Sequence, residues 1–160
     1  MIVIEKLNKS HHKAVLAIQL SEQDVRFAST PHAFVTDTTR SIEKFVIRVS
    51  SDIVGFFKLD LGYAQHYNFC SKASCGLRTL ALDTRHQAKG LGAQFMKTLP
   101  SYLAEHYSGF EFIYLTVNCK NLAAKVCYQK GGFDDTGKLY LGGPSGPQHI
   151  MRINIPLRPA

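Results

Sequence analysis

The feature that most constrains the fold is a glycine-rich turn between an apolar run and a helical pattern. Residues 77–83 predict a strand, and the turn after it reads Gln87-Ala88-Lys89-Gly90-Leu91-Gly92-Ala93. The start of a helix leaves about four backbone N–H groups without partners and carries a partial positive charge. Glycine has no Cβ, so an anion can approach the backbone closely, and Lys89 adds a full positive charge. The turn therefore predicts a phosphate site.

Two familiar phosphate loops do not fit this turn. A dinucleotide fingerprint requires a third glycine three residues after the second, and position 95 is Phe. A Walker A loop ends in Gly-Lys-Ser or Gly-Lys-Thr, whereas Gly92 is followed by Ala93-Gln94. The pattern that is left is Gln-x-x-Gly-x-Gly.

A second motif follows a short β-branched and aromatic run at residues 113–117, which predicts a strand. In the segment after this strand, Asn121, Ala124 and Tyr128 stand at i, i+3 and i+7 and therefore share one helix face. Gly132 and Phe133 close the segment. From the residues alone, Tyr128 is a core aromatic or a proton donor, and Asn121 is suited to cap the helix.

Together these motifs resemble the GNAT superfamily of N-acyltransferases over residues 76–133. The turn is similar to the acyl-CoA pyrophosphate loop, and the second segment is similar to an Asn-x-x-Ala-x-x-x-Tyr-x-x-x-Gly-Phe motif. The resemblance implies a mixed α/β fold whose central twisted sheet has about six or seven mostly antiparallel strands, splayed between the fourth and fifth, with helices on both faces. It also implies an enzyme, an acyltransferase that moves the acetyl group of acetyl-CoA to a primary amine of a small molecule.

The resemblance also assigns residues to the parts of acetyl-CoA. The strand backbone would hold the acetyl carbonyl and the pantetheine, much as it would hold a neighbouring strand. Tyr128, with an ordinary phenol pKa near 10, would protonate the leaving thiolate as general acid. Ala88 departs mildly from the family, which often has glycine or another small residue there. The cofactor-binding residues so implied are Leu80, Ala81, Leu82, Gln87, Ala88, Lys89, Gly90, Leu91, Gly92, Ala93, Asn118, Asn121 and Ala124.

The general base and the acceptor stay open. Several family members have a Glu on the fourth strand, but this strand has Gly76, Arg78 and Thr79, which leaves a water relay, His149 or Asp83 as candidates. Glu22 and Asp24 are candidates to attract a cationic amine, or are simply solvated, and residues 142–147 are a candidate substrate loop. Two alternatives are a protein or peptide N-acetyltransferase and a non-catalytic acyl-CoA-binding module.

Composition bounds the class of protein. The 160 residues predict a single domain over 1–160, and no apolar window is long enough to span a membrane or to form a signal peptide. We therefore expect a cytoplasmic protein with no membrane partner. The net charge of +7 comes from scattered residues rather than a basic run, so we expect no nucleic-acid partner. The four cysteines have no metal-ligand spacing, so we expect free thiols and no metal. A homodimer is left open.

The other elements follow from periodicity and breakers. We expect a first helix capped by Ser10 and a second that Pro31 ends. The long helix after the glycine turn contains Pro100. The expected strands are 2–4, 45–49 and 53–59 as a hairpin, 77–83, 112–117, 138–141 and 149–155. The expected helices are 10–20, a short one from Ser21, 90–106 and 121–130. Residues 62–74 are expected to form a strand end and a loop.

Overall fold

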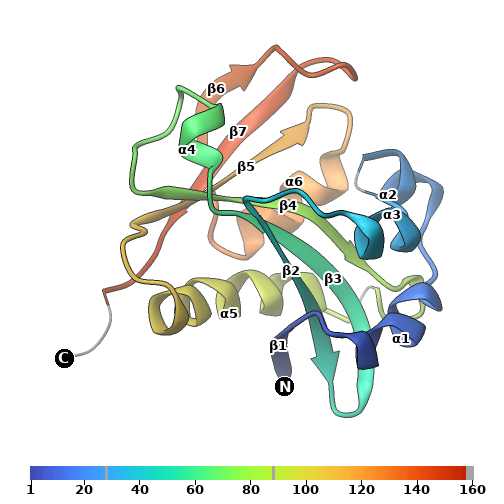
Figure 1. The fold of residues 1–160 in the computed structure, drawn as a ribbon. Helices are drawn as coiled ribbons and strands as arrows, with labels where there is room; N and C mark the ends of the chain where they lie inside the picture. Colours follow the sequence, from blue (N-terminus) through green and yellow to red (C-terminus); the bar gives the residue numbers. More distant parts are fainter. Residues whose placement is uncertain (28, 88, 158–160) are drawn as a thin grey trace. The chain divides into compact units, whose positions relative to one another are not determined.

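The computed structural model describes residues 1–27, 29–87 and 89–157, and it has a seven-stranded sheet in the order β1-β2-β3-β4-β5-β7-β6 (Figure 1). The strands are β1 (Ile2–Lys6), β2 (Ile42–Val49), β3 (Asp52–Asp60), β4 (Ser74–Leu82), β5 (Phe112–Asn118), β6 (Asp134–Tyr140) and β7 (Gln148–Asn154). The α-helices are α1 (His12–Leu16), α2 (Glu22–Phe27), α3 (Pro31–Thr36), α4 (Tyr63–His66), α5 (Leu91–His106) and α6 (Leu122–Lys130), with 3-10 turns η1 (Lys9–His11) and η2 (Thr84–His86). The predicted mixed α/β fold with a mostly antiparallel sheet is confirmed.

The chain divides into two compact units. The first comprises Met1–Gly62 and Leu77–Leu91, and the second comprises Tyr63–Gly76 and the chain from Gly92 onward. The strand β4 contributes residues to both units, and so does α5, whose first residue, Leu91, belongs to the first unit and whose remaining residues belong to the second. That the chain forms one domain stays a prediction.

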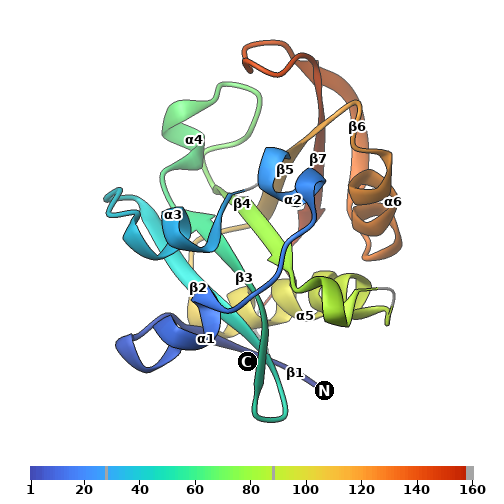
Figure 2. The same cartoon turned by 90° about the vertical axis from the view of Figure 1, so that its right-hand side faces the viewer.

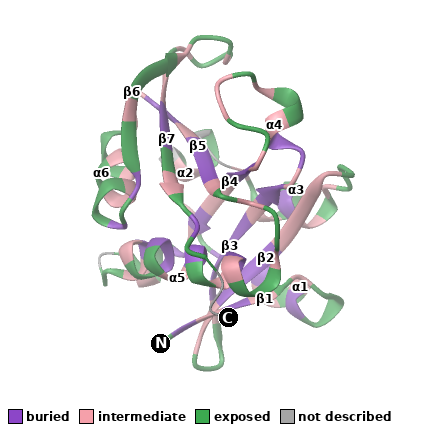
Figure 3. Cartoon of the chain, turned by 90° about the vertical axis from the view of Figure 1, so that its left-hand side faces the viewer, coloured by how far each residue is buried: buried purple, intermediate pink, exposed green. Residues whose placement is uncertain are grey.

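The first unit is built on the antiparallel strands β1, β2 and β3. Its core joins side chains of α1, α3, β2, β3 and β4, and the rings of Phe34 and Phe56 stack with centroids 4.3 Å apart. Figure 3 shows buried positions along the strands of the sheet and mainly intermediate or exposed positions on α1, α3 and the loops. A Cβ at Gly55 would lie 2.6 Å from the backbone oxygen of Ala81, so the missing side chain lets β3 and β4 approach closely.

The second unit is built on β5, β7 and β6, which pair antiparallel, and on the start of β4, which pairs parallel with β5. Tyr63, Tyr114 and Ile150 form its buried cluster. A Cβ at Gly76 would lie 2.0 Å from the Tyr63 ring, so this glycine makes room for the ring. Helix α6 runs beside β6 (Figure 2), and the Lys125 ammonium lies 2.9 Å from the Asp135 carboxylate.

The first helices begin and end at residues other than those predicted. Asn8, not Ser10, caps the first turn: its side chain accepts a hydrogen bond from the Ser10 backbone N–H at 2.8 Å. The α-helix that follows ends at Leu16 rather than near Leu20. Pro31 does not end the second helix, which stops at Phe27; it begins α3, where a proline at the first helical position has no N–H to leave unpaired.

Other boundaries also differ from the prediction, and β2 and β4 each begin three residues earlier than expected. Residues 63–66 form the short helix α4, which the polar composition of the segment did not indicate. Strand β6 begins at Asp134, four residues before the predicted Lys138, and its pairing with β7 shifts register between Asp135 and Leu139. Both differences arise because tertiary contacts, rather than local propensity, set short elements. No helix among the described residues is both long and apolar enough to cross a membrane.

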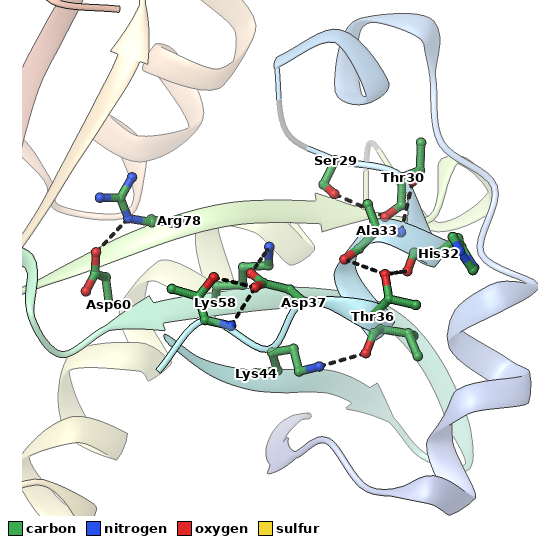
Figure 4. A network of polar contacts seen from close by, with 12 residues as sticks. Ser29, Thr30, His32, Ala33, Thr36, Asp37, Lys44, Lys58, Asp60 and Arg78 are labelled. Carbon is green, nitrogen blue, oxygen red and sulfur yellow. Dashed lines mark hydrogen bonds and ion pairs between the residues drawn. The ribbon is translucent and has the colours of Figure 1, made fainter. Parts of the chain in front are cut away.

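Polar contacts fix α3 and the segment after it onto β2 and β3 (Figure 4). The Lys58 ammonium lies 2.7 Å from the Asp37 carboxylate, and this contact holds the pKa of Asp37 well below its usual value. Lys44 donates to the backbone oxygen of Val35 at 2.7 Å. Desolvation by the surrounding protein lowers the pKa of Lys44. These contacts leave the end of α3 firmly attached to the sheet.

Candidate functional site

Strand β4 contains a residue in a left-handed backbone conformation. Thr79 has φ 52°, a value that is unusual for a β-branched residue and that interrupts the regular alternation of a strand. The preceding residue, Arg78, donates to the buried Asp60 carboxylate at 2.9 Å (Figure 4), and Asp60 also accepts from the Gly62 N–H at 2.9 Å. Strained backbone of this kind persists where surrounding contacts hold it, and it concentrates at functional sites.

The residues after Thr79 are those predicted to hold the acetyl carbonyl and pantetheine. Within β4, Leu80 and Leu82 are half-buried and Ala81 is buried. The parallel pairing of β4 with β5 joins only Ser74–Gly76 to Phe112–Tyr114. Strand β4 then continues to Leu82 beyond that register. Backbone groups along this stretch are of the kind that can bond an extended ligand.

The glycine turn presents an exposed backbone at the start of α5. Gln87, Lys89 and Gly90 are exposed, and Gly90 has φ 73° with open space where a Cβ would lie. The predicted residue Ala88 lies outside the described residues. The helix begins at Leu91, and of the remaining predicted residues Leu91 and Ala93 are half-buried and Gly92 is buried.

Asp83, a candidate general base, is engaged in the fold. Its side chain is buried, accepts from the Arg85 backbone N–H and Nε at 2.9 Å each, and accepts from Arg85 Nη2 at 2.6 Å. The Arg85 guanidinium is the main reason that the pKa of Asp83 falls to about 2. A carboxylate with so low a pKa accepts a proton poorly near neutral pH. The structure therefore argues against Asp83 as the base.

The second motif lies on and before α6. Asn121 caps the helix, and its side chain accepts from the Ala124 N–H at 3.3 Å. Ala124 and Tyr128 are half-buried, and the Tyr128 ring centroid lies 6.0 Å from that of Phe133. Ala124 and Tyr128 therefore lie on the same helix, as predicted, and Asn121 lies at its N-cap.

Asn118 and His149 lie on neighbouring strands of the second unit. The buried Asn118 donates from Nδ2 to the Ser145 backbone oxygen at 2.9 Å and accepts from the Lys120 N–H at 2.9 Å, so its amide anchors the loop before β7. His149 is half-buried, and its Nδ1 lies 3.9 Å from the Asp135 carboxylate. Lys125 is the main reason that the pKa of Asp135 is lowered.

The predicted site residues thus fall in both compact units. Within the first unit, the structure places Leu80, Ala81 and Leu82 at the end of β4, Gln87, Lys89 and Gly90 in the glycine turn, and Leu91 at the start of α5; Gly92 and Ala93, which follow in α5, belong to the second unit. Within the second, it places Asn118 at the end of β5 and Asn121, Ala124 and Tyr128 at or on α6. The sequence did not reveal the left-handed Thr79, since nothing in the letters around it signals a positive φ. Among the described residues, no group of three or more His, Cys, Asp or Glu side chains could hold a metal ion.

Known proteins are similar to this chain over most of its length. The "Uncharacterized N-acetyltransferase YbbJ" of Bacillus subtilis (strain 168) is 28% identical over 144 residues, which span 88% of this chain and 89% of the relative. The spermine/spermidine N(1)-acetyltransferase of the same organism is 26% identical over 144 residues, 89% of this chain and 93% of the relative.

A crystal structure of the aminoglycoside acetyltransferase AAC(6')-Ib in complex with coenzyme A has the same fold. Its TM-score is 0.78 at 14% identity, and the likeness covers 96% of this chain and 95% of that one. A family model described as the acetyltransferase (GNAT) family matches residues 13–133, which is more than half of the chain. The chain therefore belongs to the acetyltransferase (GNAT) family.

Proposed function

We propose that this acetyltransferase moves the acetyl group of acetyl-CoA to a primary amine of a small molecule by direct attack. The amine nitrogen forms a bond to the thioester carbonyl carbon, and the carbon–sulfur bond breaks. The departing thiolate takes a proton from the Tyr128 hydroxyl, and the amine gives up a proton to a base, for which a water relay is the simplest candidate. No covalent enzyme intermediate is required.

The single observation that carries this proposal is the left-handed Thr79 followed by the exposed glycine turn. A positive φ redirects the backbone groups of the residues that follow, which is how a strand can aim an N–H at a ligand instead of a neighbouring strand. We assign the acetyl carbonyl and pantetheine to Leu80, Ala81 and Leu82. Backbone donors that are fixed in advance are the groups that stabilise the oxyanion formed during acyl transfer.

The glycine turn is assigned to the pyrophosphate of acetyl-CoA. It offers the open N–H groups of the first turn of α5, the exposed Lys89 ammonium, and a backbone at Gly90 that no Cβ shields. Binding in the micromolar range corresponds to about −8 kcal/mol. The pantetheine also bonds Asn121 in this proposal, and the small Ala124 leaves space beside it.

The acceptor is proposed to be a small cationic amine. Glu22 and Asp24 stand in the first turn of α2, where their carboxylates can attract a protonated amine in a chain whose net charge is +7. A relative that shares 26% of its residues with this chain is named for spermine and spermidine. A chain that is this basic would otherwise repel a polyamine, so local carboxylates are needed for capture.

The test is a turnover assay with acetyl-CoA and a panel of amines. The panel contains spermidine, spermine, kanamycin and a short peptide with a free N-terminus, and release of free thiol is followed over time. We expect amine-dependent release with at least one small amine. A preference for the peptide would instead support a protein acceptor. Tight acetyl-CoA binding without amine-dependent thiol release would support a binding module and contradict the proposed function.

A further inference from the structure

The segment at the start of the glycine turn is joined to the segment that leads into α2. Both segments belong to the first compact unit, and main-chain and side-chain groups contribute to the junction. Two hydrogen bonds involve Gln19: its backbone oxygen accepts from the Thr84 N–H at 2.8 Å, and its N–H donates to Asp83 Oδ2 at 3.3 Å. Two more come from side chains of the turn segment: Arg85 Nη2 donates to the Ala17 backbone oxygen at 3.5 Å, and Gln87 Nε2 donates to Asp24 Oδ2 at 3.0 Å.

Gln87 is the residue of this junction that lies nearest the glycines. Its Nε2 donates to Asp24 Oδ2 at 3.0 Å and to the backbone oxygen of Leu82 at 2.8 Å. A side-chain amide has two N–H donors, and these two contacts use both. Reversing the amide would place its oxygen against two acceptors, so the donating orientation is the one that fits. What the side chain has left is an acceptor oxygen, which is unsuited to a phosphate.

The side chain of Gln87 therefore makes a contact within the protein. It ties the end of β4 to the first turn of α2. A helix of six residues does not hold its place by backbone hydrogen bonds alone, so the position of Asp24 depends on contacts such as this one.

We infer that Gln87 is a positioning residue that couples the glycine turn to the amine: a cofactor bound to the backbone of the turn fixes the main chain at Gln87, and the Gln87 side chain holds Asp24 where it receives the protonated amine. The inference rests on the proposed function. Coupling of this kind is reciprocal, so a bound amine must tighten coenzyme A binding by the same factor by which coenzyme A tightens amine binding.

The test is a double-mutant cycle on the amine with the highest turnover in the panel. Gln87→Ala should raise the KM for that amine about fivefold, in the range of ordinary allosteric coupling, and should change kcat by less than about twofold. In an Asp24→Ala background the same change at Gln87 should have almost no further effect, because the partner is already gone. The effect of Gln87→Ala should persist in a Glu22→Ala background, since Glu22 lies in the same helical turn and makes no described bond to Gln87.

Direct binding gives a second measurement. In the wild-type protein, calorimetric titration with coenzyme A should show about fivefold tighter binding when the amine is saturating, and Gln87→Ala should abolish that difference while leaving the affinity for coenzyme A alone unchanged within about twofold. The Gln87→Ala variant should melt within a few degrees of the wild-type protein, because the side chain of Gln87 is exposed.

Three outcomes would overturn the inference. Equal effects of Gln87→Ala with and without Asp24 would show that Gln87 does not act through Asp24. Weaker coenzyme A binding in Gln87→Ala in the absence of amine would make Gln87 a direct cofactor ligand. A wild-type protein that acetylates no amine would defeat both the inference and the proposed function, whereas an active protein with an additive cycle would defeat the inference alone.

Discussion

The N-termini of α5 and α6 differ in how their first backbone N–H groups can find hydrogen-bond acceptors. Each helix begins with N–H groups that the helix itself cannot satisfy. At α6 the chain supplies an acceptor, because the Asn121 side chain bonds the Ala124 N–H at 3.3 Å. At α5 the residue before the first helical position is Gly90, which has no side chain and is exposed. At the start of α6 a side chain caps the helix, whereas at the start of α5 the residue in that position has no side chain that could do so.

The difference shows how a helix N-terminus that can bind a ligand can be told apart from one that is capped by the protein itself. An Asn, Asp, Ser or Thr at the cap position indicates that the helix is self-sufficient there, whereas glycine with a neighbouring lysine indicates an anion partner. In the proposed reaction α5 binds the cofactor and α6 supplies the proton. The two helices should therefore respond differently to substitution.

The largest effect is expected on α6, at Tyr128. Tyr128→Phe keeps the ring beside Phe133 and removes only the hydroxyl, so kcat should fall by about 10²–10⁴-fold, the usual worth of general acid catalysis. Acetyl-CoA affinity should change little, because the lost interaction is made mainly in the transition state. Steady-state kinetics with calorimetry separates the two quantities. Wild-type turnover in this variant would assign the proton to another group or to water.

A charge reversal at the open start of α5 should have the next largest effect. Lys89→Glu places a carboxylate beside the proposed pyrophosphate position, and acetyl-CoA affinity should fall about tenfold, which is about 1.4 kcal/mol. Lys97→Glu is the matched control, because Lys97 is also exposed and lies further along α5. Calorimetry at two salt concentrations measures both. Equal losses in the two variants would mean that only net charge matters and that the turn is no specific anion site.

Asp83 should affect stability in a pH-dependent way. Its pKa is about 2 in the folded protein against an ordinary value of 3.8, so its ionised form stabilises the fold above about pH 4, and this contribution is lost as the pH falls from 4 through 2. Asp83→Asn should therefore lower the free energy of unfolding at pH 7 by about 1–2 kcal/mol, after allowance for the exposed Arg85 partner. Urea denaturation at pH 7 and pH 3 checks this, and the gap between the two proteins should narrow at pH 3.

The smallest effect is expected at the closed start of α6. Asn121→Ala removes the cap and should cost about 1 kcal/mol, a shift of about 2–4 °C in Tm. Asn121→Asp keeps the cap but removes the amide donors. If Asn121 also bonds the pantetheine, the Asp variant should retain its Tm and still bind acetyl-CoA less tightly. Unchanged affinity in Asn121→Asp would restrict Asn121 to capping.

The sequence predicted the long, strongly periodic parts of the fold well. The hairpin of β2 and β3, the helices α5 and α6, and the cap at Asn121 all appear at or near their predicted bounds. The sequence marks the ends of these elements by glycine and asparagine, and their interiors by the spacing of apolar residues. Short elements were harder to predict. Pro31 begins a helix instead of ending one, and α4 has no local signal strong enough to separate it from a loop.

The chemistry of single side chains could not be predicted in the same way. Asp83 stands at the end of a strand, where a base would be useful, yet its burial beside Arg85 makes it a structural anion. Gln87 fits the family pattern, but its donors turn toward Asp24 and Leu82. In both cases the role of the side chain depends on which residue it contacts in the folded protein. The spacing of residues in the sequence does not reveal that contact.

The irregularity of β6 also bears on how the protein behaves at high concentration. A straight strand at the edge of a sheet offers a row of unpaired backbone groups on which other chains can aggregate. Here the outer strand shifts register between Asp135 and Leu139 and contains Gly137 at φ 78°, so its edge is broken and carries charge. We expect the protein to resist fibril formation from this edge, and any self-association to use another surface.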